Sequence, residues 1–154
     1  MIEIVIAAAR AEDIAEVVRV EREAVEAPHW AEGEYVGMVG AGAVRCLLVA
    51  RRDGEIVGFA VGHLVGDEAE LESVVVRALE RRGGVGRALC RAVIAWAWES
   101  GGEVMDLEVR ASSGAIALYR GLGFDVVGQR RGYYAAPDED AVLMRLVRGV
   151  VDLE

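Results

Sequence analysis

Residues 74–89 read VVVRALERRGGVGRAL and pass from an apolar run through a glycine-rich turn into a helical pattern. The three consecutive valines are typical of a strand in the interior of a sheet. Glycines let the backbone approach an anion closely, and the free N–H groups and dipole at the start of a helix favour negative charge. The arrangement therefore predicts a site for a phosphate or pyrophosphate group.

Three known phosphate-loop patterns compete for this turn. A P-loop requires a lysine, and the chain contains none. A Rossmann G-x-G-x-x-G pattern would need a third glycine where Leu89 stands, and the turn lies mid-chain after an antiparallel hairpin. The pattern R-x-x-G-x-G is satisfied by Arg81, Gly84 and Gly86, but by itself it does not exclude an ordinary loop rich in glycine and arginine.

Short strands and helices alternate on both sides of the turn. Apolar periodicity and turn residues predict strands over 2–9, 44–51, 55–64, 69–77, 104–110, 124–128 and 141–148. They predict helices over 11–26, 32–40 and 113–121, and a further helix that follows the turn 81–86 and ends at about residue 100. Asp53-Gly54 predicts a hairpin turn, and an irregular loop is expected between the last two strands. The order predicts an α/β (α+β mixed) fold in one domain, 1–154, with about seven strands in a mixed sheet and about four helices.

The balance of charge restricts the kinds of partner. Acidic residues outnumber basic ones by 26 to 17, which gives a net charge of −9. This charge argues against nucleic acid or an anionic membrane surface as a partner. It is compatible with a basic peptide, a polyamine or an aminoglycoside, although it also serves solubility alone.

The cysteines and the chain start carry no further functional signal. Cys46 and Cys90 lie far apart, no C-x-x-C pair occurs, and neither histidine is near a cysteine, so no metal site is expected. The first residues lack the pattern of a signal peptide, and no apolar stretch is long enough for a transmembrane helix. A cytoplasmic protein is therefore expected.

Residues 106–124 read DLEVRASSGAIALYRGLGF and, together with residues 81–86, resemble the GNAT family of N-acetyltransferases. The resemblance rests on the R-x-x-G-x-G turn and on the motifs L-E-V-R, A-I-x-L-Y and L-G-F. The expected order of strands also fits the fold of that family over nearly the whole chain. Residues 67–69, 130–134, Pro137 and 140–146 are similar to the RimI-like members, which acetylate the N-terminal alanine of ribosomal proteins. The resemblance implies a GNAT-type sheet, acetyl-CoA as cofactor and direct transfer in a ternary complex.

The resemblance also implies which residues bind acetyl-CoA. They are Val74, Val75, Val76, Arg81, Arg82, Gly83, Gly84, Val85, Gly86, Arg87, Ala88 and Ser113. The chain departs from the family where an asparagine usually follows the serine, because residues 110–115 lack it and are one residue short. Ser112 and Ser113 are alternative replacements for that contact. Glu72-Ser73 also stands where RimI-like sequences often carry an apolar residue and asparagine.

Acetyl transfer to an amine needs a neutral amine, donors for the developing oxyanion and a proton for the leaving thiolate. The resemblance implies that Glu108 is the general base, acting through water, and that Tyr119 is the general acid. From the residues alone, Glu108 could equally be a solvent-facing strand carboxylate and Tyr119 a packing residue of its helix.

The expected acceptor residues are aromatic. Tyr133 and Tyr134 match a RimI-like pair, and Trp30 and Tyr35 lie in the first helical connection, which borders the acceptor site in this fold. Loop anchoring and core packing are the respective alternatives. The favoured function is acetylation of a basic protein N-terminus of the Ala/Ser type by a monomer or homodimer. The alternatives are acetylation of a small cationic amine (polyamine, aminoglycoside or amino acid) and a non-catalytic CoA-binding sensor.

Overall fold

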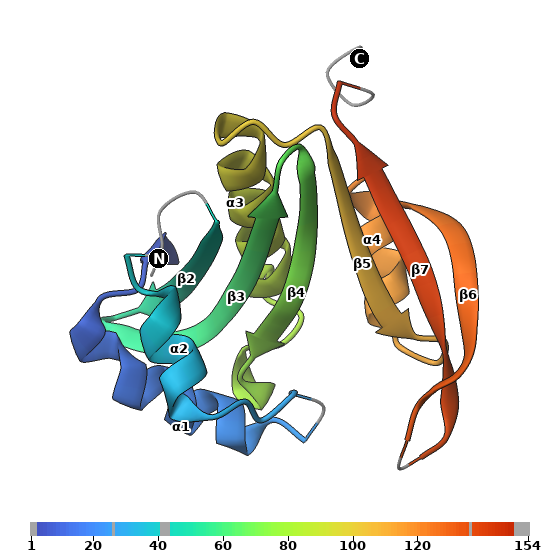
Figure 1. Ribbon diagram of the computed structural model, residues 1–154. Coiled ribbons are helices and arrows are strands. Elements are labelled where there is room, and N and C mark those ends of the chain that lie inside the picture. Colours follow the sequence, from blue (N-terminus) through green and yellow to red (C-terminus); the bar gives the residue numbers. More distant parts are fainter. Residues whose placement is uncertain (1–2, 26, 41–43, 136, 150–154) are drawn as a thin grey trace.

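The computed structural model describes residues 3–25, 27–40, 44–135 and 137–149 and contains one seven-stranded mixed sheet (Figure 1). The strand order is β1-β2-β3-β4-β5-β7-β6, and β4 and β5 are the parallel pair. The strands are β1 (Val5–Ala8), β2 (Arg45–Arg52), β3 (Glu55–Val65), β4 (Glu68–Val76), β5 (Val104–Arg110), β6 (Asp125–Tyr134) and β7 (Glu139–Val147). The predicted fold class is confirmed.

Four α-helices cover the two faces of the sheet. They are α1 (Ile14–Glu23), α2 (Glu32–Met38), α3 (Val85–Glu99) and α4 (Ala115–Gly121), with short 3-10 turns at Ala11–Asp13 and Ala78–Glu80. In Figure 1, α1 and α2 lie in front of the sheet, whereas α3 and α4 lie behind it. Successive side chains of a strand point to opposite faces of the sheet and so fill two hydrophobic cores. Phe59 packs in the core under α1 and α2, and its neighbour Ala60 packs in the core under α3.

The sheet divides at its centre. β4 pairs with β5 only where Glu68, Ala69 and Glu70 meet Val104, Met105 and Asp106, and beyond these residues the two strands diverge (Figure 1). β5 remains paired with β7 along its whole length. The pairing of β4 with β3 shifts at Glu72, which has no partner in β3 and so forms a β-bulge. The bulge lies in the part of β4 that has diverged from β5.

The last hairpin differs from the expectation. β6 extends to Tyr134 and β7 begins at Glu139, so Tyr133 and Tyr134 end a strand instead of lying in an irregular loop. The pattern of residues missed this extension because β6 is an exposed edge strand with little apolar alternation and is interrupted by register shifts.

The N-terminal elements are shorter than expected. The predicted first strand is β1, Val5–Ala8, and the helix predicted over 11–26 begins with a 3-10 turn and ends at Glu23. Ala24 is extended, which ends the helix. The predicted positions 2 and 26 lie outside the described residues.

Gly58 lets β3 lie close to β4 and α3. A Cβ at this position would stand 2.7 Å from Val75 O and 3.3 Å from Leu89 Cδ1. We expect Gly58→Ala to lower the free energy of unfolding by about 1–3 kcal/mol, because strand backbone or a packed side chain must move. Gly37→Ala on the exposed side of α2 is the control, with open space around it and an expected gain of about 0.5–1 kcal/mol. Urea denaturation of both variants measures the difference, and equal stabilities would contradict the close approach.

Candidate active site

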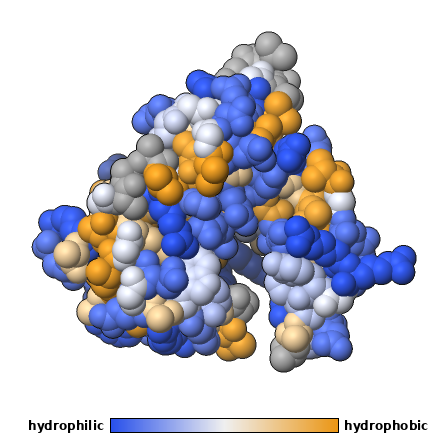
Figure 2. Space-filling view, viewed as in Figure 1, coloured by the Kyte–Doolittle hydropathy of each residue, from blue (hydrophilic) through white to orange (hydrophobic). Residues whose placement is uncertain are grey.

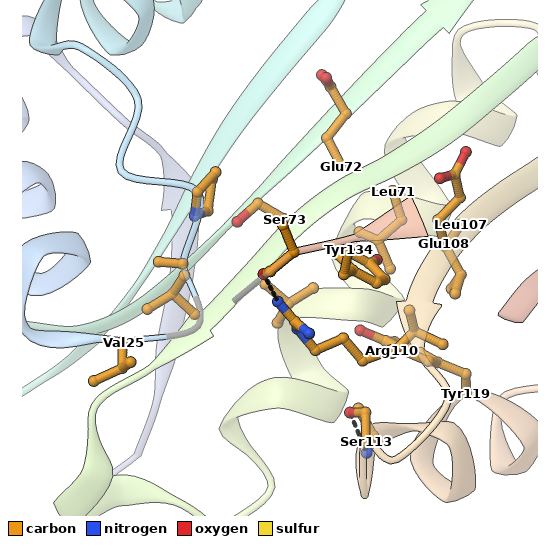
Figure 3. Close-up of a pocket in the computed structure, with 17 residues that line it drawn as sticks. Val25, Leu71, Glu72, Ser73, Leu107, Glu108, Arg110, Ser113, Tyr119 and Tyr134 are labelled. Atoms are coloured by element: carbon orange, nitrogen blue, oxygen red, sulfur yellow. Dashed lines mark hydrogen bonds between the residues drawn. The ribbon is translucent and has the colours of Figure 1, made fainter. Parts of the chain in front are cut away.

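The divergence of β4 and β5 opens a cleft of about 650 Å³ (Figure 3). β4 contributes Leu71 to Val75, and β5 contributes Leu107 to Arg110. The loop after α1 borders the opposite side with Val25, Ala27 and Pro28, and the remaining lining residues are Ser113, Ala115, Tyr119, Tyr134 and Ala135. In Figure 2 the molecule is hollowed between its two halves, and the rim of the hollow is largely hydrophilic.

The glycine-rich turn lies between β4 and the start of α3. Arg82 and Gly84 adopt positive φ angles of 69° and 87°, and Gly84 is the residue that precedes the helix. Val85 is buried and fixes the start of α3 in the core. The first N–H groups of an α-helix have no partner within the helix. The turn therefore presents backbone donors at the positive end of a 15-residue helix, which fits a phosphate-bearing group.

The side chains around this turn are differently engaged. Arg81 Nε donates to Val76 O over 3.3 Å, which ties the turn to the end of β4. Arg87 Nη2 donates to Gly121 O over 3.4 Å and so reaches the end of α4. Val74 and Val75 line the cleft along β4, where β5 does not pair with their strand edge. That edge leaves main-chain groups available to a ligand.

Glu108 lies on β5 with about a quarter of its side chain exposed. Its Oε1 is 3.5 Å from Arg130 Nη2, and its Oε2 is buried with no hydrogen-bond partner among the described residues. A hydrogen bond with Glu108 raises the pKa of Tyr133. Glu108 thus lines the cleft with one carboxylate oxygen that makes no hydrogen bond to the described residues.

Tyr119 reaches the same cleft from α4. Its ring meets Phe124 edge-on, with centroids 5.9 Å apart and planes at 63°. Burial raises the pKa of Tyr119 above its ordinary value of about 10. The hydroxyl is therefore a proton donor at neutral pH, and it shares the cleft with the carboxylate of Glu108.

The two serines of the shortened loop have separate positions. Ser113 lines the cleft, and its Oγ accepts the N–H of Ala115 at 3.1 Å, at the start of α4. The Ser112 N–H donates to Glu139 Oε2 over 2.6 Å on the exposed side of the hairpin. Of these alternatives, Ser113 is the one that lines the cleft.

The β6–β7 hairpin provides the wall formed by Tyr134 and Ala135. The Tyr133 and Tyr134 rings meet edge-on at 5.1 Å, and the guanidinium of Arg110 lies 4.5 Å from the centroid of Tyr134. Arg110 also donates to Pro137 O at 3.0 Å and Ala135 O at 3.2 Å. The types of these residues do not reveal the contacts of Arg110 with the hairpin, although the alternation of β5 places Arg110 and Glu108 on the same face.

The structure corrects the expectation for Tyr35. Its side chain is fully buried, its hydroxyl donates to Glu21 Oε2 over 2.6 Å, and its ring packs edge-on against Phe59. It cannot touch an acceptor in the cleft. Trp30 is half-buried beside Tyr35 and is not among the residues that line the cleft. The residue types showed that Trp30 and Tyr35 are aromatic residues near the expected acceptor site. They did not show which side of this segment faces the cleft.

The charged residues among those that line the cleft are Glu72, Glu108 and Arg110, and Glu70 lies within electrostatic reach of the two acids. Desolvation raises the pKa of Glu70, and the carboxylates of Glu72 and Glu108 raise it further. Such a field favours a positively charged acceptor. Among the described residues, no group of three or more histidine, cysteine or acidic side chains could hold a metal ion. No helix in the described ranges is long and apolar enough to cross a membrane.

Comparison with known proteins gives consistent similarities. Residues 11–124 match the model of the acetyltransferase (GNAT) family. The chain is 38% identical over 120 residues to the [ribosomal protein bS18]-alanine N-acetyltransferase of Escherichia coli K12, which covers 76% of this chain and 80% of that protein. The crystal structure of the Escherichia coli ribosomal-protein-S18-alanine N-acetyltransferase has a TM-score of 0.83, with 33% identity over 94% of each chain. A nourseothricin acetyltransferase structure, also 33% identical, has a TM-score of 0.63 and covers 67% of this chain and 65% of its own.

Proposed function

Because the chain belongs to the GNAT family of acetyltransferases, we propose that this N-acetyltransferase modifies the α-amine of a basic protein N-terminus that begins with alanine or serine. Acetyl-CoA is the acetyl donor of the family. The observation that carries the choice of acceptor is the 38% identity to an enzyme named for the alanine N-terminus of ribosomal protein bS18. The carboxylates of Glu72 and Glu108 in the cleft lining support a cationic acceptor. The proposal includes a cytoplasmic location, where ribosomal proteins are made, and a monomeric or homodimeric enzyme.

The proposed binding of acetyl-CoA follows from the main chain. Arg81, Arg82, Gly83, Gly84, Val85, Gly86, Arg87 and Ala88 form the turn and first helical residues that would hold its pyrophosphate. The cleft-facing edge of β4 at Val74, Val75 and Val76 would hold its acyl arm through backbone groups that β5 leaves unpaired. Ser113 lines the cleft on the other side of this path. Bound there, acetyl-CoA supplies a thioester carbonyl.

The proposed chemistry uses two protein side chains. An amine attacks only when it is neutral, and Glu108, which lines the cleft and whose Oε2 has no hydrogen-bond partner among the described residues, would take its proton through water. Tyr119 is protonated at neutral pH, and its hydroxyl donates the proton that the leaving thiolate requires. Backbone N–H groups on the open edge of β4 would stabilise the charge on the carbonyl oxygen. No cysteine takes part, since Cys46 and Cys90 are both buried thiols with raised pKa values.

Release of free CoA thiol from acetyl-CoA tests the acceptor. We expect release with a basic peptide beginning in alanine or serine and none with the same peptide blocked at its N-terminus. Mass spectrometry should place one acetyl group on the first residue. Spermidine and an aminoglycoside are parallel acceptors, and turnover of these alone would assign the enzyme to small cationic amines, as the similarity to the nourseothricin enzyme suggests. Binding of acetyl-CoA without turnover of any amine would favour the sensor alternative.

A further inference from the structure

Glu21 is a fully buried carboxylate near the end of α1. Its Oε2 accepts the Tyr35 hydroxyl at 2.6 Å and the Trp30 N–H at 2.9 Å, and its other oxygen is paired with the guanidinium of Arg22. A buried carboxylate is costly unless such donors surround it. These contacts join α1 to α2 and to the loop between them.

A line of contacts continues from this carboxylate to the cleft. The guanidinium of Arg45 on β2 lies 5.5 Å from the centroid of the Trp30 ring. Arg45 Nε donates to Glu72 Oε1 over 3.0 Å, and a second contact joins Nη2 and Oε2 at 3.5 Å. Glu72 is the bulged residue of β4 and lines the cleft. Trp30 is therefore held by Glu21 on one side and packs against an arginine fixed to the cleft wall on the other.

The other side of this loop borders the cleft. Val25, Ala27 and Pro28 are lining residues, and Val25 is 91% exposed, so its side chain has little packing of its own (Figure 3). His29 adopts a positive φ of 56°, which a residue with a side chain holds only when its surroundings impose it. The hydrogen bond between His29 Nε2 and Ala24 O, at 2.8 Å, and the contacts of Glu21, which fix Trp30 directly after His29, are such surroundings.

We propose that Glu21 is a positioning residue for the acceptor. It holds Trp30 so that Ala27, which packs against the same core cluster, and Pro28 form an apolar wall of the cleft opposite Glu72. An ordered wall avoids the entropy that a loop would lose on binding the acceptor. The inference rests on the proposed function for the peptide acceptor. Val74, Val75 and Ser113 share the cleft with this loop, whereas the turn proposed to hold the pyrophosphate, residues 81–88, is not among the residues that line it.

The test compares Glu21→Gln and Tyr35→Phe with Asp13→Asn in the full chain. Asp13 is the matched control because it is also a buried carboxylate of the same helical segment, but it bonds Arg10 N and Arg51 instead of the loop. We expect Glu21→Gln to raise the KM for an alanine-starting peptide about tenfold, since charged hydrogen bonds to Trp30 and Tyr35 are weakened. The kcat and the KM for acetyl-CoA should stay within about twofold, and Tyr35→Phe should have a smaller effect in the same direction.

The control separates positioning from loss of stability. Asp13→Asn should lower the melting temperature and leave the peptide KM unchanged. An equal peptide KM in Glu21→Gln and Asp13→Asn, or an equal rise in the KM for acetyl-CoA, would overturn the proposal. If the wild-type enzyme acetylates no peptide, the proposed acceptor is wrong, and amide exchange then decides this inference. Faster exchange of the Trp30 amide in Glu21→Gln than in Asp13→Asn would support it, and equal exchange would refute it.

Discussion

Replacing Glu108 by glutamine is expected to lower kcat for peptide acetylation by about two to three orders of magnitude, the usual contribution of a positioned general base. Glutamine keeps the size of the side chain but cannot take the proton of the amine. Steady-state kinetics at saturating acetyl-CoA and peptide measure the effect.

The pH dependence of the rate of Glu108→Gln shows whether Glu108 acts as a general base. Without a base, only amine that is already neutral reacts, so the rate of Glu108→Gln should climb as the pH approaches the ordinary pKa of an α-amine, about 8. The deficit relative to the wild type should therefore shrink at high pH. A deficit that stays constant from pH 6 to 9 would show that Glu108 only shapes the cleft.

Asp106→Asn is the matched control for Glu108→Gln. Asp106 lies two residues earlier on β5 and faces the same side, but its carboxylate is paired with Arg145 at 2.7 Å and 3.0 Å. It does not line the cleft. A rate close to that of the wild type is expected, and a loss as large as that of Glu108→Gln would mean that any charge change on this face impairs turnover.

Turns and strands that depend on neighbouring residues were predicted from the sequence. Asp53-Gly54 forms the expected hairpin turn, with both residues at positive φ, and the helix expected after the glycine-rich turn is α3, which begins at Val85, inside the predicted turn. The strand predicted over 104–110 is β5. Turn glycines and strand alternation act within a few residues, so the sequence alone reveals them.

Contacts between distant residues explain what was missed. The hydrogen bond of Tyr35 to Glu21 spans 14 positions, and the pair of Arg45 with Glu72 spans 27. The residue type alone does not show that Tyr35 will donate a hydrogen bond to the buried carboxylate of Glu21 and will therefore not line the cleft. The bulge at Glu72 likewise depends on the pairing of two strands. Glu108 and Tyr119 could be proposed as site residues only because a resemblance to a known family implies a fold in which distant residues meet.

Replacing Tyr119 by phenylalanine is expected to lower kcat by about two orders of magnitude and to leave both KM values nearly unchanged. The variant removes the proton donor for the leaving thiolate but keeps the ring, whose edge-on contact with Phe124 does not involve the hydroxyl. Thermal unfolding and calorimetric binding of acetyl-CoA should therefore match the wild type. An unchanged kcat would reduce Tyr119 to a packing residue of α4.

The raised pKa of Tyr119 makes this loss independent of pH over a wide range. Burial disfavours the phenolate, so the donating, neutral hydroxyl persists as the pH rises through the ordinary tyrosine pKa of about 10. The ratio of wild-type to Tyr119→Phe rates should thus stay constant between about pH 7 and 10. A ratio that falls within this range would mean that the hydroxyl ionises there, and the donor role would then fail at the pH where the acceptor amine is most fully neutral. A constant ratio would show that burial in the cleft keeps the proton on Tyr119 while the amine loses its own.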